Sequence, residues 1–216
     1  AMVAGGSLGG MITLCLGILA PERMGTVFSL AGDVEATPWI QGWNHVGRQA
    51  ILQDPVQGLH LARQLAHLSY RANPGLSARQ GRNMADGKDF GLAVPYALQS
   101  YLTHQGNKLM QRFHPQAYLS QLDAMDHHDV RRVPPKNDVE TWTTTRFEPQ
   151  ALGPRVYGLA IDTDQLFLAS RVQAWVDEVP QAELRTLCNP HGHDAFLLAW
   201  DDLDAILRPL VQEALT

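Results

Sequence analysis

A serine flanked by glycines near the start of the chain constrains the fold more than any other feature. Residues 5–10 are Gly-Gly-Ser-Leu-Gly-Gly, which fits the pattern G-x-S-x-G around Ser7, and an apolar run follows. Glycines are needed because the backbone turns sharply from a strand into a helix, where side chains would clash. The motif predicts a nucleophile elbow that presents the hydroxyl of Ser7. The N–H of Leu8, at the helix N-terminus, would then face a developing oxyanion.

Residues with the chemistry of a general base and its orienting acid follow near the other end of the chain. A buried strand is predicted over residues 155–161, and Asp162-Thr163-Asp164 comes directly after it. A second strand is predicted at about 183–188, followed by a polar turn that contains His191 and His193. The order Ser, Asp, His along the chain is that of catalytic triads built on such an elbow.

We therefore expect a triad of Ser7, Asp164 and His193. His193 would accept the proton of Ser7, and Asp164 would hold the imidazole tautomer and stabilise the imidazolium. Asp162 is the second candidate for the acid. The adjacent His127 and His128 do not have the spacing of metal ligands, and we expect no metal.

Several segments make the chain resemble the homoserine O-acetyltransferase family, a branch of the α/β-hydrolase superfamily. Beside the elbow, the segments that carry the resemblance are 44–51 (NHVGRQAI), 58–63 (GLHLAR), 67–70 (HLSY), 100–102 (SYL), 105–109 (QGNKL), 112–113 (RF), 118–119 (YL), 164–167 (DQLF) and 192–197 (GHDAFL). The segments between 100 and 119 and the GHDAFL block are far more specific than the elbow. Leu168 departs from the family pattern, which has proline at that position.

The resemblance implies an α/β fold, the α/β-hydrolase fold with a mostly parallel sheet and an inserted helical lid. Residues 1–35 and 150–216 would form the hydrolase core, and residues 36–149 the lid, with a loop at Val133–Asp138. The chain would be the C-terminal portion of such a protein, lacking the N-terminal strands and the second oxyanion donor. We accordingly expect it to be poorly active or inactive alone.

The resemblance also implies residues that hold the substrate. A lid arginine would bind the carboxylate of an amino acid, a tyrosine would assist, and the aspartate after the catalytic histidine would bind the amino group. The matching positions are Arg112, Tyr118 and Asp194, and Arg48 matches a position near the site entrance.

The function implied is an acyl-CoA-dependent O-acyltransferase of methionine biosynthesis, most simply homoserine O-acetyltransferase. It would work by ping-pong transfer through an acyl-Ser7 intermediate, with small-molecule substrates and no bound cofactor. The donor (acetyl-CoA or succinyl-CoA) and the acceptor (homoserine, serine or another hydroxylated amino acid) stay open. Two alternatives also stay open: a serine esterase with the same triad, and a fragment that is inactive without its N-terminal half. A homodimer through the lid is expected from the resemblance alone.

Composition agrees with a packed enzyme in a reducing compartment. The chain has 216 residues, 45% of them hydrophobic, and a formal charge of −5 without a basic stripe, which argues against a nucleic-acid partner. Its longest apolar run is too short to span a bilayer, so no membrane partner is expected. Cys15 and Cys188 lie in apolar contexts and are expected to be buried free thiols in a cytoplasmic protein.

Overall fold

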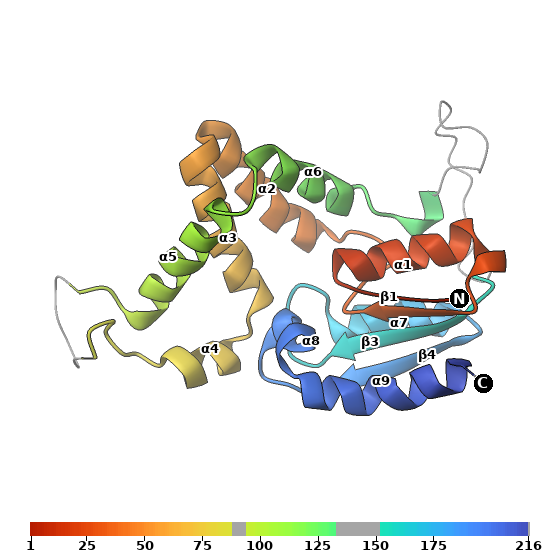
Figure 1. Ribbon diagram of the computed structural model, residues 1–216. Helices are drawn as coiled ribbons and strands as arrows, with labels where there is room; N and C mark the ends of the chain where they lie inside the picture. The colour runs from red at the N-terminus through yellow and green to blue at the C-terminus, as the bar shows by residue number, and fades with distance from the viewer. Residues whose placement is uncertain (88–93, 133–151, 216) are drawn as a thin grey trace.

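The computed structural model describes residues 1–87, 94–132 and 152–215, and its centre is a parallel sheet (Figure 1). Four strands lie in the order β1-β2-β3-β4, and all neighbours are parallel. The strands are β1 (Met2–Gly6), β2 (Thr26–Leu30), β3 (Arg155–Ile161) and β4 (Ala182–Leu187). Because β2 and β3 are adjacent although 124 residues separate them in sequence, the helices between them form one long insertion.

Helices cover both faces of the sheet because successive strand residues point to opposite sides. Val27 and Val156 pack on one face with α1 (Leu8–Leu19) and α7 (Ala169–Glu178). Phe28 and Tyr157 stack on the other face, against α9 (Trp200–Leu215). The apolar residues Leu203, Ile206, Leu207 and Leu210 of this last helix all pack in or against that cluster.

Among the described residues, five α-helices lie between β2 and β3 and extend away from the sheet (Figure 1). They are α2 (Pro38–Gln53), α3 (Pro55–Tyr70), α4 (Asn73–Gln80), α5 (Ala97–Met110) and α6 (Pro115–Asp126). Each of α2, α3 and α6 begins with proline, whose fixed φ suits the first turn. Their shared core includes Ile51, Leu59 and Leu122. These helices fall within the predicted lid, while the loop predicted at 133–138 lies outside the described residues.

Short helical elements complete the described structure. They are the 3-10 helices η1 (Pro21–Arg23), η2 (Val130–Arg132) and η4 (Gly192–Asp194), and the single-turn α8 (Ala195–Leu198). The described helices include none that is long and apolar enough to cross a membrane.

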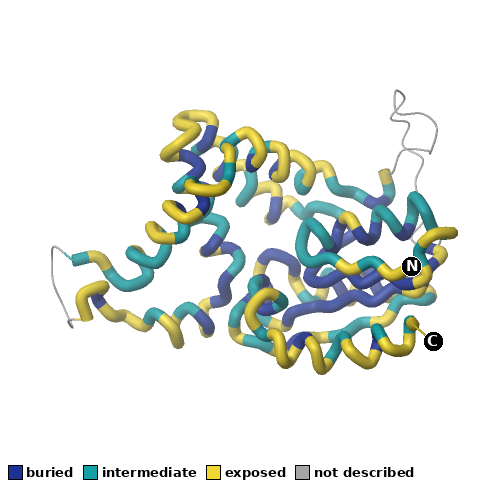
Figure 2. Tube along the Cα trace, viewed as in Figure 1, coloured by how far each residue is buried: buried dark blue, intermediate teal, exposed yellow. Residues whose placement is uncertain are grey.

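Two local expectations are corrected by the structure. Cys188 is exposed, because β4 ends at Leu187 and the chain has already left the sheet. Cys15 is only partly buried, on the helix after the elbow, with its Sγ 3.7 Å from Nδ1 of His128. Elsewhere, Asn73-Pro74-Gly75 begins α4, because proline in the first turn is compatible with a new helix. Figure 2 shows that buried residues concentrate in the strands and at the junction with the helices.

Candidate active site

Ser7 occupies a strained backbone conformation between β1 and α1. Its φ of 57° and ψ of −125° lie in a region that residues with side chains rarely adopt, at a cost of roughly 1–3 kcal/mol. The turn is held by the N–H of Ser7, which donates to the carbonyl of Leu30 at 2.9 Å. A Cβ on Gly5 would lie 2.4 Å from the carbonyl oxygen of Gly9. The predicted elbow geometry is therefore present, and it shows why the motif needs glycine there.

Asp164 and His193 form a buried pair at the carboxyl ends of β3 and β4. His193 Nδ1 lies 2.7 Å from Asp164 Oδ2, and the side chains are 3% and 0% exposed. The other carboxylate oxygen accepts hydrogen bonds from the backbone N–H groups of Leu166 (2.8 Å) and Phe167 (2.9 Å). Because an ionised carboxylate only accepts, Nδ1 must donate, and this leaves the lone pair of a neutral imidazole on Nε2. This is the tautomer that a general base needs.

The second ring nitrogen of His193 is buried and has no hydrogen-bond partner within the described ranges. Its ring is fixed by aromatic neighbours: Phe167 stacks on it at 5.0 Å, and Tyr70 and Phe196 lie at 5.6 and 5.5 Å. Phe196 also abuts the elbow, since a Cβ on Gly6 would lie 2.4 Å from its ring. Phe196 thus contacts the ring of His193 and also Gly6, the residue before Ser7. Ser7 and His193 are not hydrogen bonded to each other.

A cavity of about 290 Å³ opens at the elbow and is walled by helices of the insertion between β2 and β3. Its lining contains four of the residues singled out from the sequence: Ser7, Leu8, Arg112 and Tyr118. The remaining lining residues are Gly6, Arg63, Tyr70, Leu109, Phe113, Gln121, Leu122 and Met125. His193 and Asp194 are not among them. Tyr70 connects the cavity to the His193–Asp164 pair, because it lines the cavity and also contacts the ring of His193.

Sequence reasoning did not identify Arg63 and Tyr70 as site residues. They lie seven residues apart on α3, so that two turns of helix place them on one face, and both line the cavity. Burial raises the pKa of Tyr118, and the positive charge of Arg63 opposes that rise, which shows an electrostatic interaction between Arg63 and the Tyr118 hydroxyl. The matched segments 58–63 and 67–70 contained the signal, namely an arginine and a tyrosine at helical spacing. Arg112 also lines the cavity, but it is exposed.

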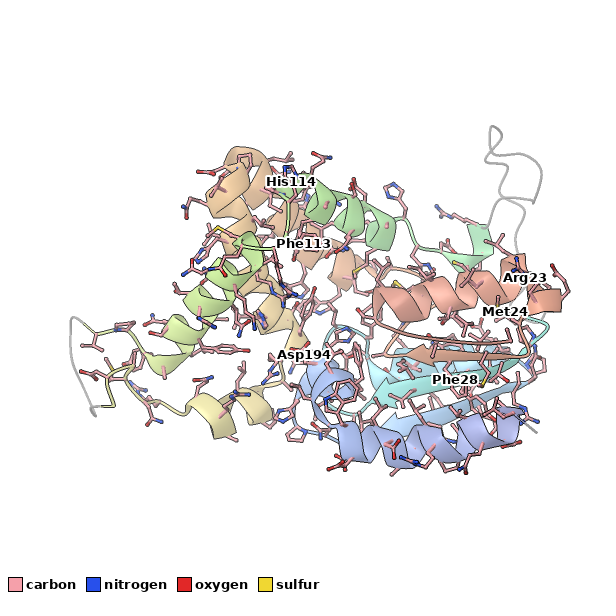
Figure 3. The ribbon with its side chains drawn as sticks, viewed as in Figure 1. Arg23, Met24, Phe28, Phe113, His114 and Asp194 are labelled. Carbon is pink, nitrogen blue, oxygen red and sulfur yellow. The ribbon has the colours of Figure 1, made fainter. Side chains whose placement is uncertain are left out.

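Asp194 lies at the junction of the sheet region and the helical insertion (Figure 3). Burial raises the pKa of its carboxyl above the usual range. The charges of His193, Arg71 and Arg63 oppose this rise. Of these groups, Arg71 forms an ion pair with Asp194, since its guanidinium lies 3.5 Å from Asp194 Oδ2.

Other candidates from the sequence have structural partners elsewhere. Asp162 accepts a hydrogen bond from the N–H of Asn189 at 2.9 Å, and no contact joins it to His193 in the structure. Arg48 forms ion pairs with Asp123 (2.8 Å) and Asp126 (2.6 Å) and ties α2 to α6. We find no grouping of three potential metal ligands in the described part of the chain.

Comparison with curated proteins finds relatives along nearly the whole chain. Homoserine O-acetyltransferase of Thermus thermophilus is 38% identical over an alignment 215 positions long, which covers 96% of this chain and 52% of the relative. Homoserine O-succinyltransferase of Janthinobacterium sp. is 33% identical over an alignment 217 positions long, which covers 92% of this chain and 54% of the relative. The chain spans about half the length of the curated relatives it matches. No protein-family model matches it.

Among solved structures, homoserine O-acetyltransferase from Staphylococcus aureus superimposes with a TM-score of 0.75 at 25% identity. The match covers 97% of this chain and 58% of the solved chain. With the parallel sheet and its flanking helices, this likeness identifies the α/β-hydrolase fold.

Proposed function

This chain belongs to the homoserine O-acetyltransferase family of α/β-hydrolase-fold proteins, and on that premise we propose that its site transfers an acyl group from acyl-CoA to the hydroxyl of homoserine. The observation that carries the proposal is the buried His193–Asp164 pair next to the elbow of Ser7. The imidazole ring of His193 contacts Phe196, and Phe196 in turn packs against Gly6 of the elbow. That arrangement suits activation of a serine hydroxyl.

In the first half of the proposed reaction, Ser7 Oγ attacks the thioester carbonyl while His193 Nε2 takes the serine proton. The carbon–sulfur bond then breaks, and the CoA thiolate leaves with the proton returned by His193. The N–H of Leu8, first residue of α1, would donate to the oxyanion of the tetrahedral intermediate. The product of this half is an ester of Ser7.

In the second half, the acceptor hydroxyl gives its proton to His193 and attacks the acyl-Ser7 ester, which releases the O-acyl amino acid and regenerates Ser7. Transfer in preference to hydrolysis needs a site that excludes water, and the helices α3, α5 and α6 wall the cavity at Ser7.

We assign the acceptor's charged groups to residues around that cavity. Arg63 and Arg112 can offer a guanidinium fork to the carboxylate, and Tyr118 a hydroxyl. Asp194 can hold the ammonium group. We expect Arg63 to contribute more than Arg112, because Arg63 interacts electrostatically with both Tyr118 and Asp194 while Arg112 is exposed.

The proposal includes a cytoplasmic location, a homodimer through the helical insertion, and acetyl-CoA as donor. Succinyl-CoA is the alternative donor, because one relative is named a succinyltransferase. Sedimentation of the purified protein would test the dimer, and competition between the two donors would test the acyl group.

The test of function is CoA release from acetyl-CoA by the full-length protein, with and without homoserine. We expect release that depends on homoserine and is lost in S7A. The matched control is S120A, because Ser120 is exposed on α6 and is not among the residues that line the cavity. Release that is indifferent to homoserine would indicate an esterase instead. Parallel assays of this chain alone would show whether it is active without the rest of the protein.

A further inference from the structure

Arg71, the residue directly after α3, is a buried cation with few partners for its charge. Its side chain is 3% exposed, and its Nε has no hydrogen-bond partner in the parts of the chain that the structure covers. The carboxylate that the structure places against it belongs to Asp194, at 3.5 Å from Nη1. Burying a guanidinium costs several kcal/mol unless a carboxylate compensates it, so the two charges stabilise each other.

The backbone around Arg71 is clamped to the turn that carries His193 and Asp194. Gly192 has a φ of +68°, and a Cβ there would lie 2.5 Å from the backbone N of Ala72 and 2.9 Å from the carbonyl oxygen of Tyr70. On the next turn of the chain, a Cβ on Gly75 would lie 2.5 Å from the carbonyl oxygen of Pro190. Two glycines thus let the α3–α4 junction and the histidine turn pack backbone to backbone.

Arg71 is not among the residues that line the cavity at Ser7, whereas Arg63 and Tyr70, on the same helix, are. Its partner Asp194 is the group assigned above to the acceptor's ammonium. A carboxylate binds ammonium only when it is ionised, and burial works against ionisation. The groups that face Asp194 are Arg71, Arg63 and Tyr70 from α3 and His193 from its own turn.

We propose that Arg71 is a positioning residue of the acceptor site, which keeps Asp194 ionised and holds its carboxylate in place from behind. This inference rests on the proposed function for its role in catalysis, and on the Arg71–Asp194 ion pair for its physical basis. It makes Arg71 necessary for the second half of the reaction and dispensable for the first.

The kinetic test compares R71M, R71Q and R71K with wild type in separate half-reactions. CoA release from acetyl-CoA without acceptor, which reports acyl-Ser7 formation, should stay within about threefold of wild type in every variant. For R71M and R71Q, the KM for homoserine near neutral pH should rise at least tenfold. The acid limb of the pH profile for homoserine should move to higher pH, because Asp194 has lost a neighbouring positive charge.

R71K keeps the charge and should restore most of the pH profile. The matched control is R79M, which removes an exposed cation from α4 and should behave as wild type. If R71M and R79M share the same KM and pH profile, or if R71M impairs both half-reactions equally with no shift of the profile, the proposal is wrong.

A second measurement does not depend on the reaction. The free energy of unfolding is compared for wild type, R71M, D194N and the double variant, near neutral pH and in mild acid. The coupling between the two substitutions should be favourable near neutral pH and should vanish in acid, where Asp194 is protonated.

The two measurements separate the failure of this proposal from the failure of the proposed function. Zero coupling near neutral pH refutes the role of Arg71 even when homoserine is a substrate. If the coupling is present near neutral pH and lost in acid, while homoserine does not accelerate CoA release, the ion pair is supported and the acceptor assignment is refuted. If R71M does not fold, R71Q takes its place in the cycle.

Discussion

The carboxylate of Asp164 accepts three hydrogen bonds, and replacing it by asparagine should disable His193 while leaving the site folded. Two of the donors are the backbone N–H groups of Leu166 and Phe167, and the third is Nδ1 of His193. In D164N the amide oxygen can still accept from the two backbone groups. The amide NH₂ then faces Nδ1, which must become the acceptor. The imidazole proton moves to Nε2, and the ring can no longer take the proton of Ser7.

The size of the effect follows from the loss of the general base. A triad histidine locked in the wrong tautomer lowers kcat by about 10⁴-fold, equivalent to roughly 5 kcal/mol of activation free energy. The stability cost is smaller, because two of the three hydrogen bonds persist and the third is replaced by a neutral bond from the amide NH₂ to Nδ1. Exchanging a bond to a charged group for a neutral one costs about 1 kcal/mol.

The assay is homoserine-dependent CoA release, with thermal unfolding measured on the same samples. D162N is the matched control, because Asp162 is two residues away and binds the N–H of Asn189 rather than His193. We expect D162N to retain kcat within about tenfold. A D164N protein that folds and loses less than tenfold in kcat would refute the reasoning, and a larger loss in D162N would make Asp162 the catalytic acid.

Three further predictions concern the elbow, the carboxylate site and pH. Gly6→Ala should lower the free energy of unfolding by about 1–3 kcal/mol, because the added Cβ would clash with the ring of Phe196 on α8. Gly9→Ala should not lower it, because the space around Gly9 is open, and chemical denaturation of both variants checks the difference. Arg63→Met should raise the KM for homoserine about ten- to a hundredfold, and Arg112→Met should raise it less; similar values would contradict the assignment. Burial lowers the pKa of His67 to about 4, so the unfolded chain binds its proton first, and stability should fall as pH drops from 6.5 towards 4. Unfolding measured against pH should show a smaller decline in His67→Gln.

Local chemistry was enough to predict the parts of the site that depend on backbone geometry. The glycines around Ser7 make a sharp turn between strand and helix possible, and the structure has that turn. The candidates for the catalytic carboxylate are Asp162 and Asp164, which directly follow β3. Because β3 and β4 are parallel, their carboxyl ends lie at the same edge of the sheet, and His193, which follows β4, lies there too. In the last helix, the spacing of Leu203, Ile206, Leu207 and Leu210 by three or four residues likewise indicates one buried face, and these residues pack together in the structure.

The contacts between elements could not be predicted in this way. Which carboxylate binds His193 depends on the turn after β3, where Asp164 rather than Asp162 points back to the backbone of residues 166–167. The exposure of Cys188 depends on where β4 ends, which hydrogen bonding between strands decides. Each outcome depends on a shift of one or two residues along the chain, and composition and periodicity do not locate the end of an element that closely.

By itself, then, the sequence determined the elbow, the order of strands and helices, and the residue types of the reactive pair, because these depend on backbone conformations that neighbouring residues impose. Only the tertiary structure decided that Arg63 and Tyr70 wall the cavity and that Arg71 pairs with Asp194. Those contacts join α3 to a turn more than a hundred residues later in the chain. Their geometry is set by how the helical insertion packs against the sheet, and no local pattern encodes that packing.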